Sequence, residues 1–326
     1  MNQHDKTAAD VRLPMRRIMV AVDDSNASRQ ALQFAARIAS PDADVRIVCV
    51  ADQPATWSAG GAFTAGDAWI TDTIASARKS LHAEAELTLD HALAAFKGRC
   101  ASVEGQVVGQ GGEIGAVVQA LSAAARDWRA DLLVVGARHR GRVKRWVDGS
   151  VSGALAVGAP CPLLVVPDEY QAQASQERSG LARAVLATDG SDPSTRAIGA
   201  AMGLLAPPTA LRAVYVVDRS GVAADPVPGS TLEEAMAAQG RKALAAAVEQ
   251  LAPCGCATET ALVATALIRD DVAHAVLRDA QAWEADLVVL GTHGRRGVAR
   301  WLLGSVAQRA VEITHLPLLL VGPAGA

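Results

Sequence analysis

The chain has 326 residues, of which half are hydrophobic and a fifth are charged, and its formal net charge is −3. This length suits two domains of ordinary size. The small net charge and the lack of a long basic run disfavour nucleic acid as a partner, because binding a phosphate backbone needs a concentrated basic face. No apolar run approaches the ~20 residues that span a bilayer, so we expect no membrane segment.

The N-terminal residues and the cysteines indicate the cellular compartment of the protein. Residues 1–14 are polar and lack the apolar core of a signal peptide, so we expect a disordered tail. The five cysteines are odd in number and widely scattered, which disfavours a disulfide framework and favours the cytoplasm. Cys254 and Cys256 have no second pair of ligands nearby, so a loop is favoured there over a metal site. Cys49 and Cys161 are expected to be small buried hydrophobes in or beside strands.

The sequence is an internal repeat. Trp128-Arg-Ala-Asp recurs as Trp283-Glu-Ala-Asp, at an offset of 283 − 128 = 155, whereas VAVDDS (20–25) recurs as LATDGS (186–191), at 189 − 23 = 166. The first half therefore carries 166 − 155 = 11 extra residues. We assign them to the Gly- and Ala-rich stretch 51–69, whose shorter counterpart is 217–230. The repeat predicts domains at 15–167 and 181–322, joined by a polar linker, 168–180.

Each half alternates short apolar runs with longer helical patterns. For the second half the pattern predicts, in chain order, a strand at 184–188, a helix with Pro193 in its first turn, a strand at 211–217, a helix at 231–250, a strand at 258–263, a helix at 271–283, a strand at 286–291, a helix from about 305 and a strand at 317–321. Strands that are apolar on both faces and alternate with helices indicate an α/β fold. We therefore predict two tandem doubly wound domains, each a five-stranded, mainly parallel sheet with helices on both faces.

The stretch GTHGRRGVARWLLGS, 291–305, follows the strand at 286–291 and carries glycines in the spacing G-x2-G-x9-G-S. In open α/β sheets, ligands bind beyond the carboxyl ends of the strands. Glycine there allows positive φ and close backbone approach, and a helix N-terminus with a serine hydroxyl attracts an anion. The pattern predicts a phosphate cradle, with a turn carrying solvated arginines as the alternative. Neither the P-loop pattern nor the dinucleotide fingerprint is present.

These motifs together resemble the universal stress protein family. The resemblance rests on the start LATDGS, the strand ADLVVLG, the glycine loop and the closing strands APCPLLVVP and THLPLLLVG, and it runs through both halves from about residue 16 to residue 322. It implies a tandem member of the family, with the fold of the adenine nucleotide alpha hydrolase-like proteins.

The resemblance also implies a ligand, because one branch of the family binds ATP. Carried onto the second half, the family pattern places Asp189 and Val216 at the nucleoside. It places the phosphates at four residues of the glycine loop: Gly291, Gly294, Gly304 and Ser305. His293 and Arg295 lie in the same loop and are able to help. ATP is expected with or without Mg²⁺, and the metal ligands stay open. An Asp before Gly-Ser at a strand end is equally typical of a turn or an N-cap, so Asp189 has a structural alternative.

The first half departs from the pattern. It keeps five of the motif positions: Asp23, Val50, Gly136, Gly149 and Ser150. However, His139 stands in place of Gly294, and Asp148 in place of Leu303. An imidazole replaces bare backbone, and a carboxylate repels phosphate unless a metal bridges them. The loop is also richer in cations. Three interpretations of the first site therefore stay open: nucleotide binding through charge, a weak site and a structural relic.

The sequence predicts a cytoplasmic stress-response protein that binds ATP mainly in its C-terminal domain and acts as a nucleotide-gated interaction module for an unknown protein partner. Two alternatives are a slow ATP hydrolase and a nucleotide-independent scaffold. No catalytic residue is nominated, because the chain lacks a nucleophile elbow and metal-binding histidine spacings, and Asp189 has no general base beside it. The closing strands 162–166 and 317–321 resemble those through which family domains pair. They predict an intramolecular pseudo-dimer and leave a homodimer open.

Overall fold

The structure is a computed structural model that describes residues 15–52, 68–111, 114–138, 151–170, 180–219, 229–266, 270–294 and 303–323. The predicted tail 1–14, most of the insert 51–69, most of its counterpart 217–230 and most of the linker 168–180 lie outside the described residues. Among the described residues, no helix combines the length and the apolar character needed to cross a membrane.

Each half contains strands and helices in strict alternation. Those of the first half are β1 Arg17–Val22, α1 Asn26–Ile38, β2 Asp44–Asp52, α2 Ala68–Ala94, β3 Ser102–Gly111, α3 Ile114–Trp128, β4 Leu132–Ala137, α4 Val151–Gly158 and β5 Leu163–Pro167. Those of the second half are β6 Arg183–Ala187, α5 Asp192–Ala201, β7 Ala210–Val217, α6 Gly229–Leu251, β8 Thr258–Ala264, α7 Val272–Ala282, β9 Leu287–Gly291, α8 Ser305–Ile313 and β10 Leu318–Val321. Every element predicted for the second half is therefore confirmed, with bounds within about two residues.

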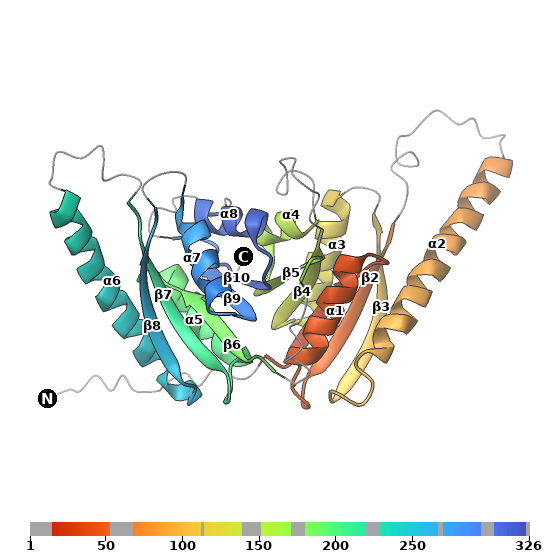
Figure 1. The fold of residues 1–326 in the computed structure, drawn as a ribbon. Helices are drawn as coiled ribbons and strands as arrows, with labels where there is room; N and C mark the ends of the chain where they lie inside the picture. Colours follow the sequence, from red (N-terminus) through yellow and green to blue (C-terminus); the bar gives the residue numbers. More distant parts are fainter. Residues whose placement is uncertain are drawn as a thin grey trace, which may run out of the picture.

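The strands form one continuous sheet in the order β3-β2-β1-β4-β5-β10-β9-β6-β7-β8. Neighbouring strands run parallel within each half, as predicted for doubly wound domains. The two halves meet at β5 and β10, which pair antiparallel with Leu164 opposite Leu319. Figure 1 shows these two strands between the halves, with α2 and α6 at the outer ends. The closing strands therefore join the two domains into one pseudo-dimeric sheet.

Helices cover both faces of this sheet, and each face has its own core. One core packs α1, α2, α5 and α6 against the strands, and the other packs α3, α4, α7 and α8. Successive residues of β4 alternate between them: Leu132 and Val134 belong to the first core, Leu133 and Val135 to the second. Strands that are buried on both faces need aliphatic side chains at every position, which explains the uninterrupted apolar runs in the sequence.

Short polar side chains start the helices that follow the first strand of each half. Ser25 is the N-cap of α1 and accepts a hydrogen bond from the amide of Ser28, and Ser191 does the same for α5 with Ser194. Pro193 lies in the first turn of α5, where its missing N–H costs no helical hydrogen bond. These caps fix the chain at the carboxyl ends of β1 and β6, where the candidate site residues Asp23 and Asp189 lie.

A buried ion pair joins the two domains at the opposite end of the sheet. Arg37 of α1 places Nη2 3.3 Å from Oδ1 of Asp286, and the side chains are 11% and 1% exposed. The Arg37 guanidinium also donates to the hydroxyl of Tyr170 and lies over the ring of Phe34. Asp286 Oδ2 accepts backbone hydrogen bonds from the start of β6. One carboxylate therefore ties together α1 of the first domain and the start of β6 in the second.

Candidate functional site

Asp189 follows β6 and is held in a tight turn. Its Oδ1 accepts hydrogen bonds from the amide and the hydroxyl of Ser191, at 3.0 and 2.5 Å. Gly190 between them has φ +77, a conformation that favours glycine. The structural alternative for Asp189 is thus correct as far as Oδ1 is concerned: this atom orders the turn that leads into α5. The other carboxylate oxygen, Oδ2, lies on the side of the glycine loop.

The glycine loop comes close to that second oxygen. A Cβ built on Gly294 would lie 3.1 Å from Asp189 Oδ2. The side chain of the neighbouring His293 forms a hydrogen bond with Thr292, whose hydroxyl oxygen lies 2.9 Å from Nδ1. Asp189 and Gly294, which are about a hundred residues apart in sequence, therefore meet at the carboxyl edge of the sheet, where parallel strands present their ligand sites.

The glycines of this loop lie close to other parts of the chain. Positive φ occurs at four of the described glycines: Gly98, Gly180, Gly190 and Gly255. Gly291, Gly294 and Gly304 do not share it, so the expectation of positive φ was wrong. Gly291 is needed because a Cβ there would lie 3.0 Å from the carbonyl oxygen of Pro193, and Gly304 because a Cβ would lie 2.9 Å from that of Thr292. At Gly291 and Gly304 the close neighbour is the chain's own backbone. The close approach of a ligand stays a prediction.

Helix α8 begins directly after Gly304. Gly304 donates its amide hydrogen to the carbonyl of Thr292 at 2.7 Å, which draws the start of α8 to the end of β9. Among the described residues, no side chain caps this helix, and Ser305, its first residue, is exposed. Backbone N–H groups of the first turn thus face outward beside a free hydroxyl, an arrangement that suits an anion. Arg295 lies outside the described residues.

The two predicted valines occupy matching places in the two halves. Val216 lies near the end of β7 opposite Val263, and Val50 lies near the end of β2 opposite Val108. Both are partly buried against the core that packs α3, α4, α7 and α8. They line the strand next to the one that carries the aspartate, at the same edge of the sheet.

The first half reproduces the turn that follows the first strand, and an arginine contacts its aspartate. Asp23 Oδ1 accepts a hydrogen bond from the amide of Ser25, as Asp189 does from Ser191, but Oδ2 accepts one from Nη2 of Arg138 at 2.8 Å. Gly136 also packs on backbone, with a built Cβ only 2.4 Å from the carbonyl group of Ala27. The remaining residues of this predicted site lie outside the described residues: His139, Asp148, Gly149 and Ser150.

Sequence reasoning missed the ion pair between Arg138 and Asp23. Arg138 counted there only as one of several loop cations. The available signal was the repeat itself, because Arg138 aligns with His293 at the same offset of 155 residues that aligns Gly136 with Gly291. A change from imidazole to guanidinium two residues after a glycine that packs on the first turn of α1 or α5 is the kind of difference that indicates an altered site.

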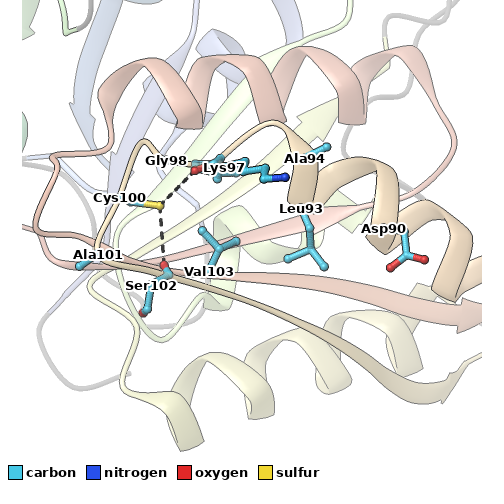
Figure 2. A pocket seen from close by; sticks show the side chains of 10 residues that line it. Asp90, Leu93, Ala94, Lys97, Gly98, Cys100, Ala101, Ser102 and Val103 are labelled. Atoms are coloured by element: carbon cyan, nitrogen blue, oxygen red, sulfur yellow. Dashed lines mark hydrogen bonds between the residues drawn. The ribbon is translucent and has the colours of Figure 1, made fainter.

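An open cavity of about 460 Å³ lies elsewhere, where α2 ends and β3 begins (Figure 2). The thiol of Cys100 in its wall donates to the carbonyl oxygens of Phe96 and Ser102, at 3.8 and 3.7 Å. Because β3 begins here, the cavity lies at the amino end of the parallel strands. It is therefore separate from the candidate site, which lies at their carboxyl ends.

Cys49 and Cys161 are expected to resist alkylation in the native protein. Burial, followed by the charges of Asp23 and Asp24, raises the pKa of Cys49 to about 11, and burial raises that of Cys161 to about 12. Only the thiolate is nucleophilic, so at pH 8 about one molecule in a thousand or fewer is reactive at either position. Iodoacetamide labelling mapped by mass spectrometry, before and after denaturation, checks this. Equal labelling rates in the two states would contradict it.

The family of the chain is shown by its sequence. Residues 14–167 and 181–322 each match the universal stress protein family. Together these two ranges contain nearly all of the described residues. The chain belongs to the universal stress protein family. As a tandem universal stress protein it carries two family domains, and its stress-response role is that of the family.

Individual relatives agree with this. Universal stress protein MJ0531 of Methanocaldococcus jannaschii is 40% identical over 57 residues, 18% of this chain and 34% of that protein, so the match spans about a third of the relative's length. A universal stress protein of Archaeoglobus fulgidus is similar over 95% of this chain and 97% of its own, with 14% identity and a TM-score of 0.60. A putative universal stress protein of Pseudomonas aeruginosa matches 95% of this chain and 94% of its own, with 14% identity and a TM-score of 0.51. At these identities the two structures show the shared fold alone.

Proposed function

We propose that this universal stress protein binds an adenine nucleotide, ATP in the first place, at the carboxyl ends of β6 and β9. The observation that carries the proposal is the approach of Gly294 to Asp189 Oδ2, where a built Cβ would lie 3.1 Å from that oxygen. A carboxylate and a bare stretch of backbone meet there beside the start of α8. Membership of the family supports the choice of ligand, because its domains carry this loop in the branch that binds ATP.

Each group has a distinct task in this proposal. Asp189 Oδ2 accepts hydrogen bonds from the ribose hydroxyls, while Oδ1 keeps the turn in place through Ser191. The exposed amides of the first turn of α8 and the hydroxyl of Ser305 donate to phosphate oxygens, helped by the positive end of the helix dipole. Val216 provides apolar contact for the base. Arg295 and the first-half residues Gly149 and Ser150, all outside the described residues, keep the roles that the family pattern gives them.

The metal requirement is a separate part of the proposal. Within the described ranges, no three side chains of His, Cys, Asp or Glu are placed together to hold an ion. The proposal therefore assigns Mg²⁺ no set of protein ligands, and ATP is titrated both with MgCl₂ and with EDTA. Phosphate release measured in the same samples separates binding alone from slow hydrolysis.

A nucleotide bound at Asp189 would act on helix α5 through a single intervening residue, Ser191. Asp189 is hydrogen-bonded to Ser191, and Ser191 caps α5. A ligand that pulls on the carboxylate thus acts on the first turn of a helix that packs beside α6. We propose that this contact transmits nucleotide occupancy to a protein partner, in the manner of other nucleotide switches. We also place the protein in the cytoplasm, because all five cysteines are free, as suits a reducing compartment.

Asp189→Ala is expected to weaken ATP binding tenfold or more. A hydrogen bond to a charged group contributes about 1.5–3 kcal/mol, and the variant also loosens the turn before α5. Isothermal titration calorimetry of the full chain measures the affinity. Asp192→Ala is the matched control, since Asp192 is an exposed carboxylate three residues away, in the first turn of α5. A wild-type chain with no heat of binding and no thermal stabilisation by millimolar ATP would contradict the proposed function.

A further inference from the structure

We propose that Cys254 and Cys256 form a thiol–disulfide exchange site, in which a small-molecule disulfide oxidises the two thiols to a bond between their sulfur atoms. Of the five cysteines of the chain, only these two are separated by a single residue. Both are free and half-buried, in the connection between α6 and β8. Because β8 begins there, the pair lies at the amino ends of the parallel strands, away from the proposed nucleotide site.

The backbone of this connection holds the two cysteines at a separation that suits a disulfide. A short 3₁₀ helix, Ala252–Cys254, ends at Gly255, whose φ of +65 and ψ of 12 are left-handed values that favour glycine. A residue in a helical conformation of either hand places the Cα atoms of its two neighbours about 5.5 Å apart, as the dimensions of a helical turn require. This is a usual Cα separation for disulfide-bonded cysteines. The amide of Gly255 closes the turn by donating to the carbonyl of Ala252 at 3.2 Å.

The thiols interact within this turn. The thiol of Cys256 donates to the carbonyl oxygen of Cys254 at 3.7 Å, so its sulfur is turned back toward the residue that it would join. Burial raises the pKa of Cys254, and the charge of Cys256 raises it further, whereas burial alone raises the pKa of Cys256. Only a thiolate attacks a disulfide, so Cys256 is expected to react first, and slowly at neutral pH.

The exchange takes two steps, and the small disulfide is the oxidant. The thiolate of Cys256 attacks one sulfur of the small disulfide, which breaks its S–S bond, forms a mixed disulfide and releases one half as a thiol. The thiolate of Cys254 then attacks the Cys256 sulfur and releases the other half as a thiol. The two cysteines together lose two electrons and two protons, and these convert one small disulfide into two thiols.

The closed bond is expected to open again when small thiols are plentiful. It would lie in a partly exposed turn, and exposed disulfides are the labile ones. In a reducing compartment such as the cytoplasm, disulfides are usually transient and serve redox sensing or catalysis. The pair therefore suits a reversible response to a rise in small disulfides.

The test lowers the total glutathione tenfold at a constant ratio of reduced to oxidised glutathione, chosen to oxidise about half of the pair in the wild-type chain. Closing the bond converts one oxidised glutathione into two reduced ones, so by mass action the ratio of closed to open pair should rise about tenfold. A cysteine that forms only a mixed disulfide with glutathione should not respond, because its oxidised fraction depends on the glutathione ratio alone. Mass spectrometry of acid-quenched and alkylated peptides measures each site.

Cys100 is the matched control within the same chain. It is also half-buried and lies in the corresponding connection of the first half, between α2 and β3. The residues two positions away from it are Gly98 and Ser102, so it has no neighbour with which to close such a bond. Whatever fraction of Cys100 carries glutathione is expected to stay unchanged on dilution.

Three results for the wild-type chain would overturn the inference. These are a pair that stays reduced in oxidised glutathione alone, a pair that carries glutathione in place of the bond, and a bond between two chains on a non-reducing gel. Cys254→Ser is expected to trap one glutathione on Cys256, in a fraction that dilution leaves unchanged. A tenfold response that persists in Cys254→Ser or in Cys256→Ser would also count against the pair. These measurements need no nucleotide, so they do not depend on the proposed function.

Discussion

Arg37→Ala is expected to lower the free energy of unfolding by about 3 kcal/mol. Arg37 pairs with Asp286 at 3.3 Å, and the carboxylate is 1% exposed. Removing one partner of a buried pair leaves a charge in a poorly solvated place, which costs more than the pair itself contributes. Asp286 keeps two backbone donors, the amides of Ala182 and Arg183, so the loss should lie near the lower end of the range for broken buried pairs.

Arg16→Ala is the matched control for this result. Arg16 also pairs with an aspartate, Asp42, at 3.1 Å, but both side chains are 56% exposed. An exposed pair contributes at most about 1 kcal/mol, so this variant should unfold at nearly the wild-type urea concentration. Urea unfolding followed by circular dichroism measures both variants. Equal shifts for the two would mean that burial of the Arg37 pair contributes nothing.

The Arg37 pair also breaks the symmetry between the domains. The position equivalent to Arg37 in the second half is Gly203, and that of Phe34 is Ala200. The backbone contacts across the junction remain reciprocal: Gly180 donates to the carbonyl of Arg37, and Met15 donates to that of Gly203. A pair of identical chains would have to carry the same side chains on both sides. Fusion of two domains in one chain permits an ion pair that only one side of the junction forms, between Arg37 of the first domain and Asp286 of the second.

The strands and their order along the chain could be predicted because they need little more than local information. Runs such as Leu163–Pro167 and Leu318–Val321 are aliphatic at nearly every position, as strands buried on both faces must be. Serine or glycine then marks the start of several of the following helices: α1, α5 and α8. The repeat supplied the rest, since a pattern that is unclear in one half is often clear in the other.

The site was only partly predictable, because its spacing is local while its contacts are not. The glycine pattern predicts a phosphate cradle after β9, but it does not reveal that Gly291 packs against Pro193, which lies about a hundred residues earlier in the chain. The contact of Arg138 with Asp23 and that of Arg37 with Asp286 also join distant segments. No periodicity or motif encodes such a pairing, so only the folded chain reveals which charge meets which.

Gly136→Ala is expected to destabilise the first domain by about 3 kcal/mol. Its Cβ would lie 2.4 Å from the carbonyl carbon and oxygen of Ala27 and 2.7 Å from the amide nitrogen of Ser28. All three are backbone atoms of the first turn of α1, which cannot turn aside as a flexible side chain could. The helix or the end of β4 must therefore shift, and the turn that holds Asp23 shifts with it.

Two other glycines calibrate this expectation. Gly291→Ala meets backbone at 3.0 Å, so it should lose only about 1 kcal/mol, together with some affinity for ATP. Gly115 is exposed in α3 with nothing within 4 Å of a built Cβ, and alanine there should add about 0.5 kcal/mol through the better helix propensity. Urea midpoints should therefore rank Gly115→Ala first, Gly291→Ala next and Gly136→Ala last. A Gly136→Ala protein as stable as Gly115→Ala would show that α1 does not lie against β4 as the structure places it, because no rotamer change can relieve a clash between a Cβ and backbone atoms.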